Sequence, residues 1–243
     1  MSFPPGQKKR AIITGASSGI GKATALAFAG AGIDVALVAR SQTSLEAVAT
    51  AAQEAGVEAK VFQIDLAKIE AVKTKIEAIA ADFGPIDILV NNAGMGYTNL
   101  LSDTPIADWQ KIIDLNLTSV FQCVLGVLPE MRQRAAGTII NVASMAASMP
   151  IPQWGAYGVS KAGLVAFSKV LAAEERANGI RVMTISPGAV NTPIWDTDTV
   201  QADLNRAAML KPETVAELIL QIALLSAEAV VDELTIMPSA GIL

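Results

Sequence analysis

The sequence predicts an α/β protein, a single doubly wound domain in which helices cover both faces of a largely parallel sheet of about seven strands. Three observations lead to this fold class. Short apolar runs alternate with longer helical segments along the whole chain, as in consecutive β-α-β units. A glycine-rich turn directly follows the first apolar run, and no segment is long or polar enough to form a linker. One domain is therefore expected over residues 1–243.

The predicted strands are short runs of mainly apolar residues, as expected for parallel strands that are buried on both faces. The second, Ile33–Ala39, is apolar throughout except for Asp34. The fourth, Ile86–Val90, runs directly into the polar pair Asn91 and Asn92. In chain order the seven predicted strands are Ala11–Thr14, Ile33–Ala39, Glu58–Ile64, Ile86–Val90, Gly137–Ala143, Ile180–Ser186 and Glu233–Met237.

The predicted helices are rich in alanine, leucine and other helix-forming residues, and several end at recognised stop signals. Gly56 closes the segment Thr43–Ala55, and Gly84 closes Lys68–Phe83. The six predicted helical segments are Lys22–Ala29, Thr43–Ala55, Lys68–Phe83, Thr104–Arg134, Gly155–Ala177 and Pro212–Leu225.

The fourth helical segment is long and contains residues that disfavour a regular helix. Thr104 and Pro105 have the character of an N-cap followed by a first-turn proline. Gly126 and Pro129 lie further along, and an internal proline removes a backbone donor and clashes with the preceding turn. A kink or break at these two residues is therefore expected before the segment ends near Arg134.

Composition excludes several classes of function. The net charge of −5 and the pI near 4.8 argue against a general nucleic-acid binder, which needs a basic face. The chain contains no histidine and one cysteine, Cys123, which rules out an internal disulfide and argues against a zinc site. We recognise no signal peptide and no membrane-spanning run, and expect a cytoplasmic protein.

The turn after the first strand has the spacing Gly-x-x-x-Gly-x-Gly, formed by Gly15, Gly19 and Gly21. Strand, glycine turn and helix in this order direct backbone N–H groups and a helix N-terminus toward a phosphate. The first gap is one residue wider than in the usual dinucleotide fingerprint. The alternative, a turn that only joins strand to helix, is weaker because the glycines stand where a pyrophosphate needs close backbone approach.

The end of the second strand bears on the choice of nucleotide. An acidic residue about 20 positions after the glycine turn binds the ribose 2′-hydroxyl of NAD. This chain has Ala39, Arg40 and Ser41 there, so no carboxylate repels a 2′-phosphate and a guanidinium is available to bind one. The expected cofactor is NADP(H). The alternative is an arginine that only extends its aliphatic part along the strand end.

Tyr157 and Lys161 are candidates for proton chemistry in a chain without histidine. Four residues apart on a helix, they lie on one face, and a nearby ammonium favours the ionised form of a phenol. We therefore expect Lys161 to lower the pKa of Tyr157 below its ordinary value of about 10. Such a pair alone is more typical of a solvated helix face, so this interpretation depends on the rest of the chain.

Further polar or glycine residues follow six successive predicted strands. Ligands of doubly wound folds bind beyond the carboxyl ends of the strands, so these residues are expected to meet at one edge of the sheet. Taken singly, each is an ordinary loop residue. They are Gly15–Gly21, Arg40, Asp65, Asn91–Gly94, Ser144 and Pro187–Gly188.

This set, in this order, resembles the short-chain dehydrogenase/reductase family over nearly the whole chain. The resemblance implies a Rossmann-type domain and an oxidoreductase that transfers a hydride between NADP(H) and a carbonyl or alcohol. It also implies a small-molecule substrate and a homodimer or homotetramer. It rests on Thr14–Gly21, Asn91–Gly94, Asn116, Ser144, Tyr157-x-x-x-Lys161 and Pro187-Gly188-x-x-x-Thr192.

The resemblance also implies a role for each matching residue at the reacting centre. Tyr157 would be the general acid and base at the substrate oxygen, and Ser144 would orient and polarise that oxygen. Lys161 would lower the pKa of Tyr157 and bind the nicotinamide ribose. Asn116 would hold a water that links Lys161 to a proton relay.

Other matching residues would bind the cofactor. Asp65 would contact the adenine, Asn91 would lie in the adenosine ribose region, and Thr192 would contact the carboxamide. The full set implied for the cofactor is Gly15, Ser17, Ser18, Gly19, Ile20, Gly21, Arg40, Ser41, Asp65, Leu66, Asn92, Ala93, Gly94, Tyr157, Lys161, Pro187, Gly188, Val190 and Thr192.

The motifs do not identify the substrate. Residues 190–211 form a long segment after the sixth strand, and such a segment is a substrate lid in the resembled family. Trp195 is equally suited to line the substrate site or to form an oligomer contact. The residues expected around the substrate are Ser144, Met145, Trp154, Tyr157 and Trp195.

Three functions stay open at this point. The first is an NADP(H)-dependent carbonyl or alcohol oxidoreductase. The second is a 3-oxoacyl-thioester (acyl-carrier-protein) reductase, although Leu234–Ala240 lacks the Asp-Gly-Gly ending common in those enzymes. The third is a non-catalytic NADP(H)-binding sensor or scaffold. The intact set Ser144, Tyr157 and Lys161 argues against the third, because a binder has no need of it.

Overall fold

The computed structural model describes residues 8–241 and contains a seven-stranded sheet in which all neighbouring strands are parallel. Their order is β3-β2-β1-β4-β5-β6-β7. The predicted fold class is confirmed, and each predicted strand is present with bounds shifted by no more than two residues. The strands are β1 (Arg10–Thr14), β2 (Asp34–Ala39), β3 (Ala59–Gln63), β4 (Ile88–Asn91), β5 (Gly137–Val142), β6 (Ile180–Pro187) and β7 (Glu233–Ile236).

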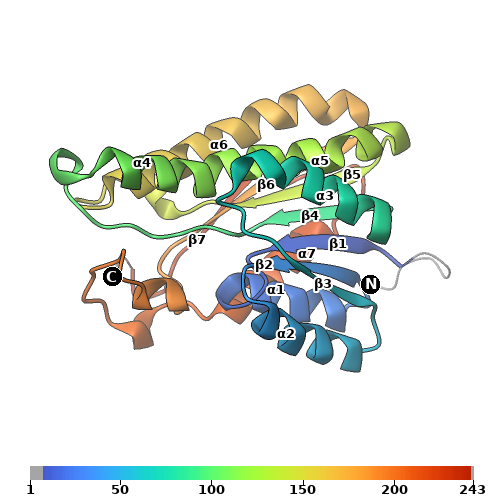
Figure 1. Ribbon diagram of the computed structural model, residues 1–243, viewed down its shortest axis with the longest axis horizontal. Coiled ribbons are helices and arrows are strands. Elements are labelled where there is room, and N and C mark those ends of the chain that lie inside the picture. Colours follow the sequence, from blue (N-terminus) through green and yellow to red (C-terminus); the bar gives the residue numbers. More distant parts are fainter. Residues whose placement is uncertain (1–7, 242–243) are drawn as a thin grey trace.

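Helices cover both faces of this sheet (Figure 1). The strand order reverses its direction of growth at β1, which lies between β2 and β4, and ligands of such folds bind at this point. One layer contains α1 (Gly19–Gly30), α2 (Gln42–Glu54) and α7 (Pro212–Ala223). The other layer contains α3 (Ile69–Phe83), α4 (Ile106–Ile113), α5 (Ser119–Arg134) and α6 (Gly155–Glu175).

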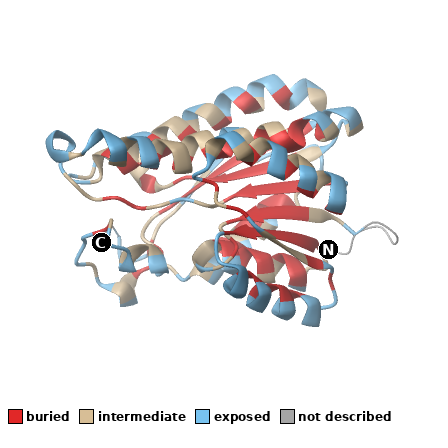
Figure 2. Ribbon diagram, viewed as in Figure 1, coloured by how far each residue is buried: buried red, intermediate tan, exposed pale blue. Residues whose placement is uncertain are grey.

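Two hydrophobic clusters, one on each face of the sheet, hold the layers together. Successive side chains of a strand point to opposite faces, so Ile13 packs in the cluster of Phe28 while Ile12 packs in the cluster of Phe83. All four of these side chains are at most 1% exposed, and the central strands are buried along their length (Figure 2). Full burial of a large apolar side chain contributes about 1.5–3 kcal/mol, so this double core holds the strand ends rigidly.

The segment predicted as one long helix is divided, but at other residues than predicted. A π-helical turn, Asp114–Thr118, separates α4 from α5. The sequence predicts a kink or a break at Gly126 and Pro129; the helix α5 continues through both residues, so the break is absent. Gly126 instead permits close helix packing, because a Cβ there would lie 2.7 Å from two carbons of Ile76 in α3.

The start of α4 also differs from the prediction. Pro105 occupies the N-cap position, where the sequence predicts Thr104. The hydroxyl of Thr104 donates to the carbonyl of Leu100 at 2.8 Å and makes no cap. The local turn that precedes α4 therefore competes successfully for this hydroxyl.

By length and composition, the helical stretch Ile106–Arg134 is able to span a membrane, and 50% of its most apolar window is buried inside the fold. The core helix of a folded domain passes the same test. Within this stretch Cys123 is 1% exposed. Burial raises the pKa of the Cys123 thiol to about 12, so the thiol stays protonated at neutral pH.

The close approach at Gly126 gives a stability prediction. Gly126→Ala places a Cβ against Ile76, and we expect the overpacking to cost about 1–3 kcal/mol and to lower Tm by several degrees. Thermal unfolding measures the effect. Gly30→Ala in α1 is the matched control, because no heavy atom lies within 4 Å of its added Cβ. Equal stability of the two variants would contradict the assignment of Gly126 to packing.

Candidate active site

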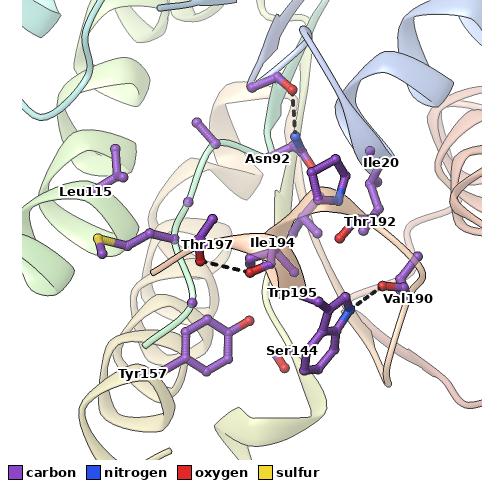
Figure 3. Close-up of a pocket in the computed structure, with 18 of the residues that line it drawn as sticks. Ile20, Asn92, Leu115, Ser144, Tyr157, Val190, Thr192, Ile194, Trp195 and Thr197 are labelled. Carbon is purple, nitrogen blue, oxygen red and sulfur yellow. Dashed lines mark hydrogen bonds between the residues drawn. The ribbon is translucent and has the colours of Figure 1, made fainter. Parts of the chain in front are cut away.

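A cavity of about 1090 Å³ lies beyond the carboxyl ends of the strands. It is at the upper limit of the volumes of about 300–1,000 Å³ that ligand pockets usually have. Figure 3 shows Ile20, Asn92 and Thr192 toward one end of this cavity, and Ser144, Tyr157 and Trp195 toward the other. Residues predicted from six strand ends therefore meet in one place.

Hydrogen bonds between the ends of β1 and β4 fix the glycine turn. The hydroxyl of Thr14 accepts the backbone N–H groups of Asn92 and Ala93, both at 3.0 Å. The side-chain amide of Asn92 donates to the carbonyls of Thr14 at 3.0 Å and Gly15 at 3.4 Å. Gly15 has φ +67°, and a Cβ on Gly21 would lie 2.2 Å from the carbonyl oxygen of Gly15. Glycine is therefore required at both positions.

The N-terminus of α1 is open toward the cavity. Its first N–H groups have no intrahelical partner, and Ser18 at the N-cap makes no side-chain capping bond. Gly19, with φ +53°, lies under Thr192, whose Cγ2 would be 3.0 Å from a Cβ at Gly19. Unsatisfied donors at the positive end of a helix, next to an open cavity, fit a phosphate or pyrophosphate.

The ends of β2 and β3 contribute polar groups to the same cavity. Arg40 is exposed at the rim, and its carbonyl accepts the Gln63 side-chain amide at 2.9 Å. One carboxylate oxygen of Asp65 accepts the N–H of Ala67 at 3.1 Å, which fixes the side chain and leaves the other oxygen available. The hydroxyl of Ser41 caps α2 by accepting the N–H of Ser44 at 3.3 Å.

Tyr157 and Ser144 place two hydroxyl groups side by side at the other end of the cavity. Tyr157 lies in the first turn of α6, and Ser144 lies two residues after the end of β5. Burial raises the pKa of Tyr157, and a hydrogen bond with Ser144 opposes this effect. The Ser144 hydroxyl also accepts the N–H of Ala146 at 3.1 Å, which sets its orientation. A protonated phenol and an oriented hydroxyl therefore lie together at this end of the cavity.

Lys161 differs from the prediction made for it. Its ammonium donates to the carbonyl of Val142 at 2.9 Å and lies 5.9 Å from the centroid of the Tyr157 ring. The predicted lowering of the Tyr157 pKa is not found, because desolvation of the buried phenol outweighs the other effects. Burial also lowers the pKa of Lys161 itself, to about 8. The sequence pattern reports the i,i+4 spacing but not the burial of both groups.

Asn116 is fully buried in the π-helical turn and does not line the cavity. Its side-chain oxygen accepts the N–H of Met95 at 2.8 Å, and its amide donates to the Met95 carbonyl and to Ser160, both at 3.0 Å. A Cβ on Gly94 would lie 3.1 Å from the Asn116 oxygen and 3.5 Å from the Lys161 nitrogen. Asn116 thus fixes the strand-end loop beside Lys161.

Two residues implied for the cofactor do not reach the cavity. Asn91 is 2% exposed and its amide donates at 2.8 Å to Asn141, which donates to Ser168 of α6, so its side chain is buried on the α6 face of the sheet and not directed toward a ribose. Gly21 is buried against Gly15. The other residues of the predicted cofactor and substrate sets line the cavity, Leu66, Pro187, Gly188, Val190, Met145 and Trp154 among them.

Some residues of the cavity wall were not predicted from the sequence. Met237 follows β7, and the rule that placed the other strand ends applies to it as well. Ile194, Asp198 and Leu204 come from the 190–211 segment, which has no periodicity to indicate which side faces the cavity. Lys111 of α4 carries no sequence signal for a site.

Comparison with known proteins places this chain in a family. Residues 9–203 match the model of the short chain dehydrogenase family, and the chain belongs to this family of oxidoreductases. A 3-oxoacyl-[acyl-carrier-protein] reductase of Synechocystis sp. is 38% identical over 210 residues, which cover 85% of each chain. A reductase of the same description from Staphylococcus epidermidis is 39% identical over 183 residues, 75% of each chain.

Solved structures extend the comparison to nearly the full chain. An alcohol dehydrogenase from the archaeon Thermococcus sibiricus, complexed with 5-hydroxy-NADP, has a TM-score of 0.88 at 30% identity and covers 96% of this chain and 97% of its own. L-Sorbose reductase from Gluconobacter frateurii, complexed with NADPH and L-sorbose, has a TM-score of 0.86 at 32% identity and covers 96% of both chains.

The buried ammonium of Lys161 gives a prediction about stability. In Lys161→Met the cost of burying a charge disappears, while one hydrogen bond to Val142 is lost. For the protein without cofactor at neutral pH, we expect a net gain of about 1–3 kcal/mol and a Tm higher by several degrees.

The gain should depend on pH. Because the pKa of Lys161 falls from 10.5 to about 8 on folding, the unfolded chain binds more protons than the folded chain between these values. The stability of the wild type therefore rises as the pH increases from about 8 to 10.5. The extra stability of Lys161→Met over the wild type is greatest below pH 8 and disappears above pH 10.5. Thermal unfolding across the window measures this, with exposed Lys75→Met as control. A Lys161→Met protein that is less stable than wild type at neutral pH would contradict the prediction.

Proposed function

We propose that this chain is an NADP(H)-dependent oxidoreductase that interconverts a carbonyl and an alcohol, with Tyr157 as general acid and base. The observation that carries the proposal is the convergence of the Tyr157 and Ser144 hydroxyls on one end of a cavity whose other end is a glycine turn with free helix N–H groups. A dinucleotide that bridges the two ends brings its nicotinamide to the hydroxyl pair.

When bound, the reduced nicotinamide would supply a hydride, the electron pair that forms the new C–H bond at the carbonyl carbon. The hydroxyl of Tyr157 donates its proton to the substrate oxygen as the C=O π bond breaks, while Ser144 donates a hydrogen bond to the same oxygen. Burial keeps Tyr157 protonated and ready to donate. The ammonium of Lys161, 5.9 Å from the ring, stabilises the phenolate that remains.

The preference for NADP(H) follows from the rim of the cavity. Arg40 lies there without an ion-pair partner in the described part of the chain, and Ala39 and Ser41 beside it carry no negative charge. A guanidinium binds a phosphate through two charge-assisted hydrogen bonds. We also propose a cytoplasmic location, a homo-oligomeric state, and a lid function for the 190–211 segment.

A 3-oxoacyl-thioester reductase is the second candidate, and the names of the relatives favour it. The C-terminal segment is a specific difference. Met237 lines the cavity, and a Cβ on Gly188 would lie 3.0 Å from its sulfur, so this segment forms part of the wall. The residues that follow β7 here are not the Asp-Gly-Gly ending common in those reductases.

Removing the phenol hydroxyl tests the proposed acid. We expect Tyr157→Phe to lower kcat by about 10²–10⁴-fold or more at saturating substrate, while the Kd for NADPH changes little. The other tyrosine of the chain supplies the control. Tyr97 donates to Asp108 at 3.0 Å and does not line the cavity, so Tyr97→Phe should keep its activity. Near-normal turnover by Tyr157→Phe would exclude it as the acid.

Arg40 is tested by the ratio of two cofactors. Loss of charge-assisted hydrogen bonds in Arg40→Gln should lower kcat/KM for NADPH by about 10–100-fold and leave the value for NADH almost unchanged. Steady-state kinetics with both cofactors measure this ratio. The control variant Arg176→Gln removes an exposed arginine outside the cavity and should leave the ratio of the two kcat/KM values unchanged. A wild-type protein that prefers NADH would refute the NADP(H) assignment.

A further inference from the structure

Two tryptophans from distant parts of the chain meet beside Tyr157. Trp154 immediately precedes α6, and Trp195 lies in the 190–211 segment. The Trp154 ring is 5.4 Å from that of Tyr157 and 5.6 Å from that of Trp195, both in edge-to-face arrangement. Both indoles line the cavity. The three rings form a continuous aromatic surface, which we call the aromatic wall, next to the proposed reacting centre.

Hydrogen bonds and an ion pair hold the Trp195 part of the aromatic wall in place. The indole N–H of Trp195 donates to the carbonyl of Val190 at 2.7 Å, which orients the ring (Figure 3). Asp196, the next residue, pairs with Arg206 at 3.0 Å. Arg206 also donates to the carbonyl of Thr192 at 3.0 Å. A ring oriented by its own hydrogen bond, on a backbone whose neighbouring residues are held by Arg206, loses little freedom when a ligand packs against it.

The tip of the segment that carries Trp195 is also attached to the rest of the fold. The hydroxyl of Thr199 donates to the carbonyl of Gly96 at 2.8 Å, and the hydroxyl of Thr98 accepts the N–H of Gln201 at 2.7 Å. The N–H of Thr98 donates to the Thr199 carbonyl at 2.9 Å. The segment therefore closes one end of the cavity and sets the distance between the wall and Tyr157.

The remaining surroundings do not favour a charged substrate. Apolar side chains of Met145, Ile151, Ile194 and Leu204 line the cavity together with the two indoles. Among the described residues lining the cavity, the charged ones are Arg40, Asp65, Lys111, Lys161 and Asp198. Arg40 and Asp65 lie at the strand ends proposed for the adenosine part, and Lys111 and Asp198 have opposite charges. Arg206, near Trp195, is engaged by Asp196 and the Thr192 carbonyl and is not among the lining residues, so among the described residues no arginine of the cavity lining stands at the aromatic wall to bind a carboxylate or phosphate.

We propose, building on the function proposed above, that the aromatic wall selects an uncharged carbonyl compound with an aromatic ring attached directly to its carbonyl carbon, an aryl ketone or aldehyde. The Trp154 and Tyr157 ring centroids are 5.4 Å apart, so we place the substituent of a carbonyl bound at the Tyr157 hydroxyl beside Trp154. Aromatic rings attract one another at centroid distances of about 4.5–7 Å, and each such contact is equivalent to roughly two- to ten-fold in affinity.

The reaction balances for this substrate as it does for any ketone. The C=O π bond breaks, one C–H bond forms with the hydride of NADPH, and one O–H bond forms with the proton of Tyr157. The ketone is reduced to a secondary alcohol by two electrons, and NADPH is oxidised to NADP⁺. Solvent returns the proton to Tyr157. The wall contributes to binding and orientation only.

The test compares kcat/KM for acetophenone, 2-butanone and acetoacetyl-coenzyme A with NADPH and the full-length protein. We expect wild type to favour acetophenone over 2-butanone by about ten-fold or more. Trp195→Ala and Trp154→Ala should each reduce this preference by roughly two- to ten-fold, and Trp195→Phe should keep most of it. The Kd for NADPH, measured for every variant, shows that the folded cofactor site is retained.

Trp109 supplies the matched control, because it packs against the cluster of Tyr97 and Ile112 and does not line the cavity. Trp109→Phe should leave the acetophenone preference unchanged. Equal use of acetophenone and 2-butanone by wild type, or a preference for acetoacetyl-coenzyme A, would overturn the inference and leave the proposed hydride transfer intact. If the protein reduces none of the three substrates, both this inference and the proposed function are overturned.

Discussion

The junction between β1 and β4 is the constraint on which the rest of the site depends. The single hydroxyl of Thr14 accepts two backbone N–H groups from the loop after β4 and donates to the carbonyl of Val90 at 3.3 Å. These buried bonds lie where the strand order reverses, so the glycine turn and the 92–94 loop move as one body. They fix the loop after β4 against the glycine turn that precedes the open helix N-terminus.

The sequence predicted the elements that depend on local pattern and on burial from both faces. Apolar runs located all seven strands, and the rule for strand ends brought most predicted site residues to one cavity. The same rule misplaced Asn91, because it identifies the end of a strand but not the face to which a side chain points. Asn91 and Asn92 are adjacent, and only Asn92 faces the cavity.

Features that depend on packing between distant segments could not be predicted from the sequence. The helix-breaking signals at Gly126 and Pro129 were overridden by contact with α3, while the π-helical turn around Asn116 has no local signature. The pKa of Tyr157 depends on how deeply α6 is buried, which residue spacing does not show. Residues 190–211 line part of the cavity, and individual hydrogen bonds such as those of Arg206 place their side chains.

The buried thiol of Cys123 has a practical consequence for labelling experiments. With its pKa near 12 and its side chain inside α5, the only sulfhydryl of the chain is closed to peroxides and alkylating agents. A cysteine introduced at exposed Gln201 would therefore be the only reactive one. A fluorophore or spin label attached there would report on the surroundings of residues 190–211, and Cys123 would not first have to be replaced.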